Sequence, residues 1–180
     1  MRILIAGLAL GLLWGSSALA ALGVGDTAPD FTAKAAVGGK VFTFHLAEAL
    51  QKGPVVLYFY PKSFTSVCTE EAHDFADRAE DFTAAGATLI GLSVDTIDTQ
   101  IQFSSLGCRD KFPVAADPDG SVAKSFEALT SLPVVNLAKR ISFVIAPDGK
   151  IIYSYEDRAA AGHIENTLRA LRAWRDTHKS

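Results

Sequence analysis

The chain has 180 residues, of which 49% are hydrophobic and 21% charged, so it holds enough apolar material for one globular core. Its 17 basic and 20 acidic residues give a formal net charge of −3. This mildly acidic balance, without a basic stretch, argues against a nucleic-acid partner.

The first twenty residues have the pattern of a secretory signal peptide. Arg2 precedes the apolar run ILIAGLALGLLWG, and SSALA then ends in the small-x-small triplet at residues 18–20. The apolar run is shorter than the roughly 20 residues needed to span a bilayer, which disfavours a membrane anchor. We therefore expect a signal peptide over residues 1–20 and a mature domain over 21–180. The mature protein is expected to be periplasmic or secreted, with no stable membrane association after cleavage.

The mature chain alternates predicted strands and helices. The first half of the mature chain is predicted to form a hairpin around Gly38-Gly39, a buried strand PVVLYFY at 54–60, a helix from Ser66 to about Ala85 and a buried strand at 87–95. A helix from about Thr96 to Arg109, a short strand and turn in FPVAADPDG and a helix of about ten residues capped by Ser121 are predicted next. The chain then closes with a strand, turn and strand over 140–156 and a helix that places Ile164, Leu168, Leu171 and Trp174 on one face. This order predicts an α/β, thioredoxin-like domain, in which helices flank a mixed central sheet and a hairpin opens the chain.

Cys68 falls in the first turn of a predicted helix, just after a buried strand. There its sulfur faces unpaired backbone N–H groups and the positive end of the helix dipole, which favour thiolate over thiol. Thr65, three residues earlier, can bring its hydroxyl near the sulfur. A structural interpretation stays open, in which Cys68 is a small buried apolar residue and Thr65 only caps the helix.

The stretch VVLYFYPKSFTSVCTEEA arranges Pro61, Thr65 and Cys68 as Pro-x-x-x-Thr-x-x-Cys. This resembles the active-site loop of peroxiredoxins of the AhpC/TSA superfamily, in the bacterioferritin-comigratory or Q subgroup. The likeness extends to GDTAPDF, FPVAADPDGSVAKSF and KRISFVIAPDGKI. It implies that a Cys68 thiolate attacks a peroxide and becomes a sulfenic acid, with Thr65 and Arg140 as donors. It also implies that Pro61 shields the sulfur and that Glu71 helps to hold Arg140.

Cys108, forty residues after Cys68, is the other thiol of the chain. By the resemblance, it condenses with the sulfenic acid to form an intramolecular disulfide. The commonest pattern of the subgroup has the second cysteine five residues after the first, where this chain has His73; some members carry it on the following helix instead. A permanent structural disulfide between Cys68 and Cys108 remains the alternative for an exported chain.

The sequence therefore predicts an exported thiol peroxidase that reduces hydrogen peroxide and small organic hydroperoxides without metal, haem or flavin. The expected partners are the peroxide and an exported thioredoxin-like reductant, and the protein is expected to be a monomer or a homodimer. A thiol-disulfide oxidoreductase on the same fold is disfavoured by the lack of Cys-x-x-Cys. A non-enzymatic binding protein with a fixed disulfide is the remaining alternative. We interpret His45, His163 and His178 as surface or helix-end residues.

Overall fold

The computed structural model describes residues 22–131, 133 and 135–178. The predicted signal peptide lies outside the described residues. Within those residues, every helix is too short or too polar to cross a membrane.

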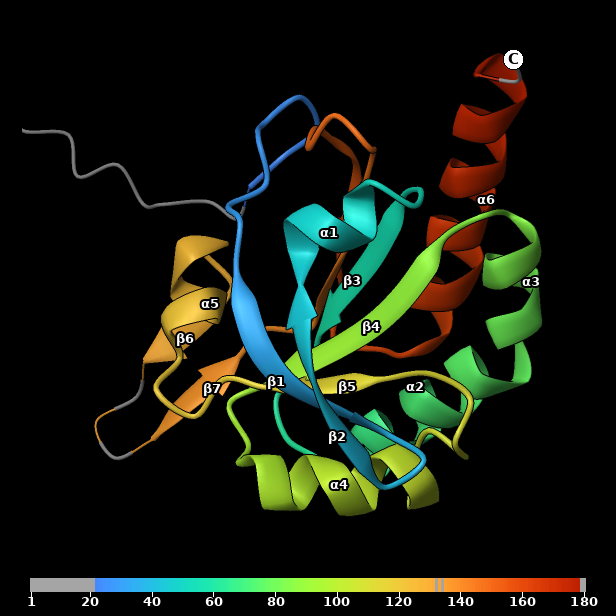
Figure 1. Cartoon of the computed structure of the whole chain (residues 1–180). Helices are drawn as coiled ribbons and strands as arrows, with labels where there is room; N and C mark the ends of the chain where they lie inside the picture. Colours follow the sequence, from blue (N-terminus) through green and yellow to red (C-terminus); the bar gives the residue numbers. More distant parts are fainter. Residues whose placement is uncertain (1–21, 132, 134, 179–180) are drawn as a thin grey trace, which may run out of the picture.

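A seven-stranded mixed sheet forms the centre of the domain, in the order β2-β1-β5-β4-β3-β8-β9 (Figure 1). Its strands are β1 (Thr32–Val37), β2 (Lys40–His45), β3 (Val55–Phe59), β4 (Thr88–Ser93), β5 (Val114–Ala116), β8 (Ile141–Ile145) and β9 (Ile151–Glu156). β1 and β2 form the predicted hairpin, whose turn residues Gly38 and Gly39 both take positive φ. β3 is parallel to β4 and antiparallel to β8, while β4 is parallel to β5. This topology confirms the predicted thioredoxin-like fold with its N-terminal hairpin.

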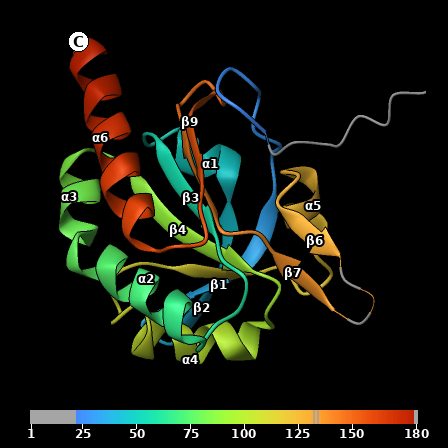
Figure 2. The same cartoon turned by 180° about the vertical axis from the view of Figure 1, so that it is seen from behind.

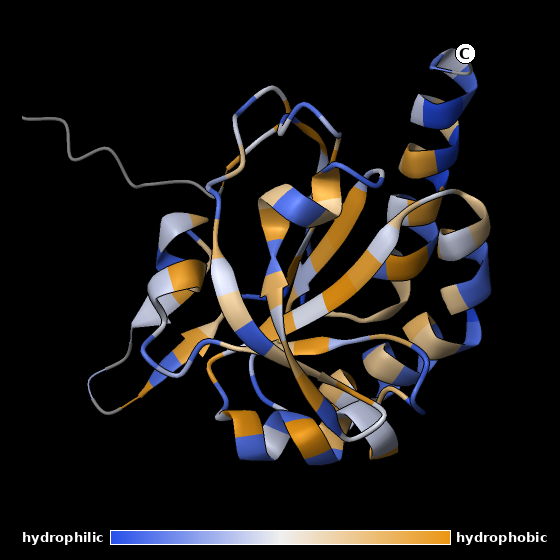
Figure 3. Cartoon of the chain, in the orientation of Figure 1, coloured by the Kyte–Doolittle hydropathy of each residue, from blue (hydrophilic) through white to orange (hydrophobic). Residues whose placement is uncertain are grey.

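β3 is buried on both faces and separates two apolar cores. Val55, Leu57 and Phe59 belong to one core, whereas Val56 and Tyr58 belong to the other, as the alternation of side chains along a strand requires. Figure 3 shows apolar residues gathered on the central strands.

Helices cover each of the two cores. The first core is covered by α1 (Leu46–Leu50) and α5 (Ser121–Ser125), and the second by α2 (Ser66–Asp77), α3 (Ala79–Ala84), α4 (Ile97–Leu106) and α6 (Ala161–Thr177). Seen from behind, α2, α3 and α6 lie together on one side of the sheet (Figure 2). Cys68 and Cys108 both belong to the second core, so both thiols lie on this side of the sheet.

The helix predicted from Ser66 to Ala85 was wrong in one respect, because it is two helices that break at Arg78. The backbone of Arg78 leaves the helical region (φ −110°, ψ 7°). Its side chain pairs with Asp81 of α3 and with Glu165 of α6, so a contact distant in sequence accompanies the break. In α6, Ile164, Leu168 and Leu171 are buried as predicted, while Trp174 is half-buried and stacks on His178.

The helix predicted after the Asp117 turn was also wrong in its length and its cap. α5 has five residues rather than about ten, and its N-cap is Gly120 (φ 72°) instead of Ser121. It ends early because Glu127 takes a positive φ of 55°. A hairpin that the sequence analysis did not predict follows, formed by β6 (Leu129–Ser131) and β7 (Asn136–Ala138).

The carboxylate of Asp117, not the hydroxyl of Ser121, caps α5. Asp117 is 3% exposed and accepts the N–H groups of Val122 (3.1 Å) and Ala123 (2.8 Å). We expect Asp117→Ala to lower the free energy of unfolding by about 1–3 kcal/mol, because it leaves two donors unpaired. Ser121→Ala is the matched control and should cost less than about 0.5 kcal/mol in denaturant unfolding. Equal losses in the two variants would contradict this assignment.

Candidate active site

Cys68 lies in the first turn of α2, where the sequence placed it. β3 ends at Phe59, a short loop follows, and α2 begins at Ser66 with Thr65 at the N-cap position. Cys68 is 1% exposed. Its sulfur therefore lies at a helix N-terminus, whose backbone N–H groups and dipole favour negative charge.

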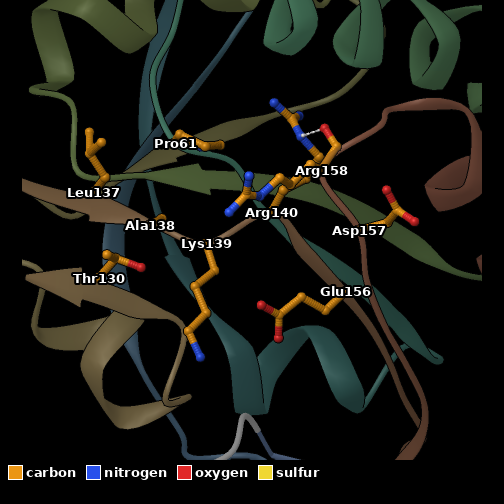
Figure 4. A pocket seen from close by; sticks show the side chains of 9 residues that line it. All are labelled: Pro61, Thr130, Leu137, Ala138, Lys139, Arg140, Glu156, Asp157 and Arg158. Atoms are coloured by element: carbon orange, nitrogen blue, oxygen red, sulfur yellow. Dashed lines mark hydrogen bonds between the residues drawn. The ribbon is translucent and has the colours of Figure 1, made fainter.

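The guanidinium of Arg140 reaches the same sulfur from a different part of the fold. Arg140 directly precedes β8, and its Nη2 donates to Cys68 Sγ at 3.1 Å. Its Nη1 donates to Glu71 Oε2, and its Nε donates to the carbonyl oxygen of Arg158 at 3.1 Å. Figure 4 shows the bond between Arg140 and Arg158 at the edge of a pocket. Because all three of its nitrogens have partners, the orientation of the guanidinium is set before any reaction.

Burial shifts the pKa values of the charged groups around this contact. Glu71 is fully buried, and burial raises its pKa to about 8, although Arg140 acts in the opposite direction. Burial also works against the charge of Arg140, but the attractions of Glu71 and Cys68 raise its pKa. Arg140 therefore keeps its positive charge next to Sγ, and an adjacent cation stabilises a thiolate.

His163 is a site residue that the sequence analysis misjudged. His163 does lie at a helix end, in the first turn of α6, which is one of the two predicted positions, but it is fully buried and not a surface residue. Its Nδ1 lies 2.8 Å from Ser142 Oγ and 3.9 Å from Glu71 Oε1, and its Nε2 lies 3.1 Å from the Asp157 carbonyl oxygen. Burial lowers the pKa of His163. Its only sequence signal was its position beside Ile164, which the helical pattern already placed in the core.

Thr65 and Pro61 lie in the loop between β3 and α2, just before Cys68. The hydroxyl of Thr65 donates to the Lys62 carbonyl oxygen at 2.9 Å, a bond that shapes the loop. Pro61 and Arg140 line a pocket of 820 Å³. The other lining residues are Thr130, Leu137, Ala138 and Lys139 on one side and Glu156, Asp157 and Arg158 on the other (Figure 4). A solute in this pocket can approach Arg140.

Cys108 lies two residues beyond the end of α4 and is fully buried. Both cysteines are free thiols in the structure. Burial raises the pKa of the Cys108 thiol, with a smaller contribution from Asp110. The fold thus brings the two cysteines into one core but gives them opposite surroundings: Cys68 beside a cation, and Cys108 among apolar groups.

Comparisons with known proteins point to one family. The AhpC/TSA family model matches residues 24–154. The chloroplastic 2-Cys peroxiredoxin BAS1 of Hordeum vulgare is 35% identical over 157 residues, which are 83% of this chain and 74% of the relative. The crystal structure of peroxidoxin BcpB from Mycobacterium tuberculosis matches with a TM-score of 0.78 and 32% identity over 84% of this chain and 97% of that one. Peroxiredoxin Q of Xanthomonas campestris matches with a TM-score of 0.69 and 27% identity over 79% of this chain and 90% of that one.

Proposed function

The chain belongs to the AhpC/TSA family and is a peroxiredoxin, a thiol-dependent peroxidase, and from this premise we propose that Cys68 is its peroxidatic residue. The observation that carries this assignment is the 3.1 Å bond from Arg140 Nη2 to Cys68 Sγ. The bond joins the predicted nucleophile to the predicted cation across 72 residues of sequence. Cys108, by contrast, has surroundings that favour the uncharged thiol.

Peroxide reduction at this site is a nucleophilic displacement. The Cys68 thiolate attacks the terminal oxygen of the peroxide, an S–O bond forms and the O–O bond breaks. The departing oxygen takes a proton from water, and Cys68 is left as a sulfenic acid. Arg140 is oriented by Glu71 and Arg158 before the reaction, so it stabilises the charge that develops on the departing oxygen without a reorganisation cost.

The proposed substrates are hydrogen peroxide and small organic hydroperoxides. The 820 Å³ pocket beside Arg140 supports this breadth, because its volume exceeds what hydrogen peroxide needs. Pro61, Leu137 and Ala138 give it apolar walls against which an organic group can pack.

The proposed second half-reaction uses Cys108. Its thiol condenses with the Cys68 sulfenic acid, so that an S–S bond forms and water leaves. Both cysteines are buried in the same core, which supports their meeting after a local rearrangement of the segments that carry them. An exported, thioredoxin-like dithiol is the proposed reductant of the disulfide.

Two substitutions test the roles in peroxide reduction. Cys68→Ser should abolish peroxide consumption, and Arg140→Ala should lower the rate of Cys68 oxidation by about a hundredfold, as for the loss of one preorganised donor. Stopped-flow intrinsic fluorescence of the reduced protein measures both. Arg169→Ala, which removes an exposed arginine of α6, is the control and should react at the wild-type rate. Full activity in Cys68→Ser would end the assignment of Cys68.

Cys108→Ser tests the second half-reaction. It should leave the first turnover intact, block recycling by a dithiol and let excess peroxide carry Cys68 on to sulfinic acid. Mass spectrometry of the oxidised wild type should show one intramolecular Cys68–Cys108 link. A Cys68–Cys68 dimer or a stable sulfenic acid in the wild type would remove Cys108 from the mechanism and leave Cys68 in place.

Export is proposed from the signal-peptide pattern of residues 1–20. The mature protein should begin at Ala21 and be found outside the cytoplasm. N-terminal sequencing of the purified native protein checks this. An intact Met1 in a membrane fraction would indicate an uncleaved anchor instead.

A further inference from the structure

One carboxylate oxygen of Glu71 is buried without a donor. Glu71 is fully buried, and its Oε2 accepts a hydrogen bond from Arg140. Its other oxygen, Oε1, is also enclosed, yet none of the described residues donates a hydrogen bond to it. An ionised carboxylate is an acceptor at both oxygens, so burial would strip Oε1 of its solvation with nothing in return. The site therefore lacks one donor hydrogen at this atom.

His163 is the group that faces Glu71 Oε1. Its Nδ1 lies 3.9 Å from Oε1 and 2.8 Å from Ser142 Oγ. Its Nε2 lies 3.1 Å from the Asp157 carbonyl oxygen, which can only accept, so Nε2 carries a hydrogen. A neutral His163 then presents a lone pair at Nδ1, toward the lone pairs of Oε1. Two acceptors thus face each other inside the core, and one proton on either atom removes the conflict.

The groups that act on Glu71 lie on α2 and just before β8. Burial raises the pKa of Glu71 to about 8, Arg140 lowers this pKa, and Asp74, one turn further along α2, raises it. Cys68 shares the Arg140 guanidinium with Glu71, because its sulfur accepts a bond from Nη2. A Cys68 thiolate takes part of the attraction of Arg140 and, as a like charge, adds to the preference of Glu71 for its neutral form.

The groups that act on His163 come from three further segments. Burial lowers the pKa of His163, Asp157 raises it and Arg140 lowers it. Tyr155 of β9 packs the edge of its ring on the imidazole, with centroids 4.9 Å apart. A Cys68 thiolate acts against Arg140 here, since a negative charge favours a protonated imidazole. The charge of the sulfur therefore favours the proton on either member of the pair.

We propose that Glu71 and His163 share one proton, which is held while Cys68 is a thiolate and released when oxidation removes the charge of the sulfur. The held proton supplies the hydrogen that Oε1 and Nδ1 lack and leaves the attraction of Arg140 to the sulfur. Once Cys68 is uncharged, Glu71 ionises against Arg140 and the proton passes to solvent. His163 is thus a positioning residue that acts through Glu71.

The released proton balances the peroxide reaction. Attack of the Cys68 thiolate forms the S–O bond and breaks the O–O bond, and the departing oxygen leaves a hydroxide when it takes a proton from water. The proton from the pair of Glu71 and His163 neutralises that hydroxide. This release rests on the proposed peroxidase function, whereas the dependence of the proton on the charge of the sulfur does not.

The dependence on the charge can be measured without peroxide. Carbon-13 NMR follows the Glu71 carboxyl through a pH titration of the reduced protein and of Cys68→Ser, in which no thiolate forms. The midpoint should fall by about one pH unit in Cys68→Ser, because a like charge is removed. Glu71→Gln identifies the signal by its loss, and the exposed Glu48 of α1 should titrate identically in both chains. Equal Glu71 midpoints would overturn the proposal.

Nitrogen-15 NMR of the imidazoles distinguishes a shared proton from one held by Glu71 alone. The His163 ring, identified by the loss of its signals in His163→Gln, should titrate together with Glu71 and should differ between the reduced protein and Cys68→Ser. His45 of β2 and the exposed His178 are internal controls and should be the same in both chains. A His163 ring that does not respond would remove it from the pair.

Proton uptake during oxidation gives a second readout, which a merely structural residue would not change. Attack on a thiolate takes one proton from solution for each Cys68 oxidised. At pH 8, near the pKa of Glu71, the wild type should take up about half a proton, because the pair releases about half of its own. Glu71→Gln has no carboxyl proton to release and should take up one, while Glu48→Gln, the matched control, should behave as the wild type.

Equal uptake in the wild type and Glu71→Gln would overturn the release. A wild type that consumes no peroxide would refute the proposed peroxidase function instead, and the two NMR titrations would still decide where the proton lies.

Discussion

Arg140 is buried and carries a positive charge, and the arrangement of the site depends on the groups that pair with that charge. Two of its partners, Cys68 and Glu71, lie three residues apart on α2 and so share one face of that helix. The third is the carbonyl oxygen of Arg158, just before α6. An unpaired charge would be costly here, so α2, the start of β8 and the approach to α6 dock in an arrangement that gives each nitrogen of the Arg140 guanidinium an acceptor.

A layer of aromatic side chains connects the surroundings of the two cysteines. Tyr58 of β3 stacks on Phe75 of α2 with ring centroids 4.4 Å apart and meets the edge of Phe112, which follows the Cys108 turn, at 6.0 Å. The alternation of side chains along β3 directs Tyr58 into this core and its neighbours Leu57 and Phe59 into the other. Cys68, Cys108 and the side chain of Tyr58 thus share one core.

The bond from Arg140 to Cys68 has two consequences at once. It sets a cation against the sulfur, and it joins the first turn of α2 to the residue that precedes β8. Because the two groups are 72 residues apart in sequence, their relative orientation depends on the packing of α2 against the sheet and on neither segment alone.

The sequence by itself determined most of the strand and helix order, but not the β6–β7 hairpin or the break between α2 and α3. It also determined the buried character of β3 and the place of Cys68 at a helix N-terminus, because each of these depends on the spacing of neighbouring residues. The contact of Arg140 with the Cys68 sulfur could be predicted only by family resemblance, since no local pattern links two residues that are 72 positions apart. Only the tertiary structure decided that His163 is buried, because Ser142 and Glu71, which face it, come from two other elements. It likewise decided that the helix predicted from Ser66 breaks at Arg78, because Arg78 pairs with Glu165 of α6, and a local helical preference yields where contacts between distant segments stabilise the chain more.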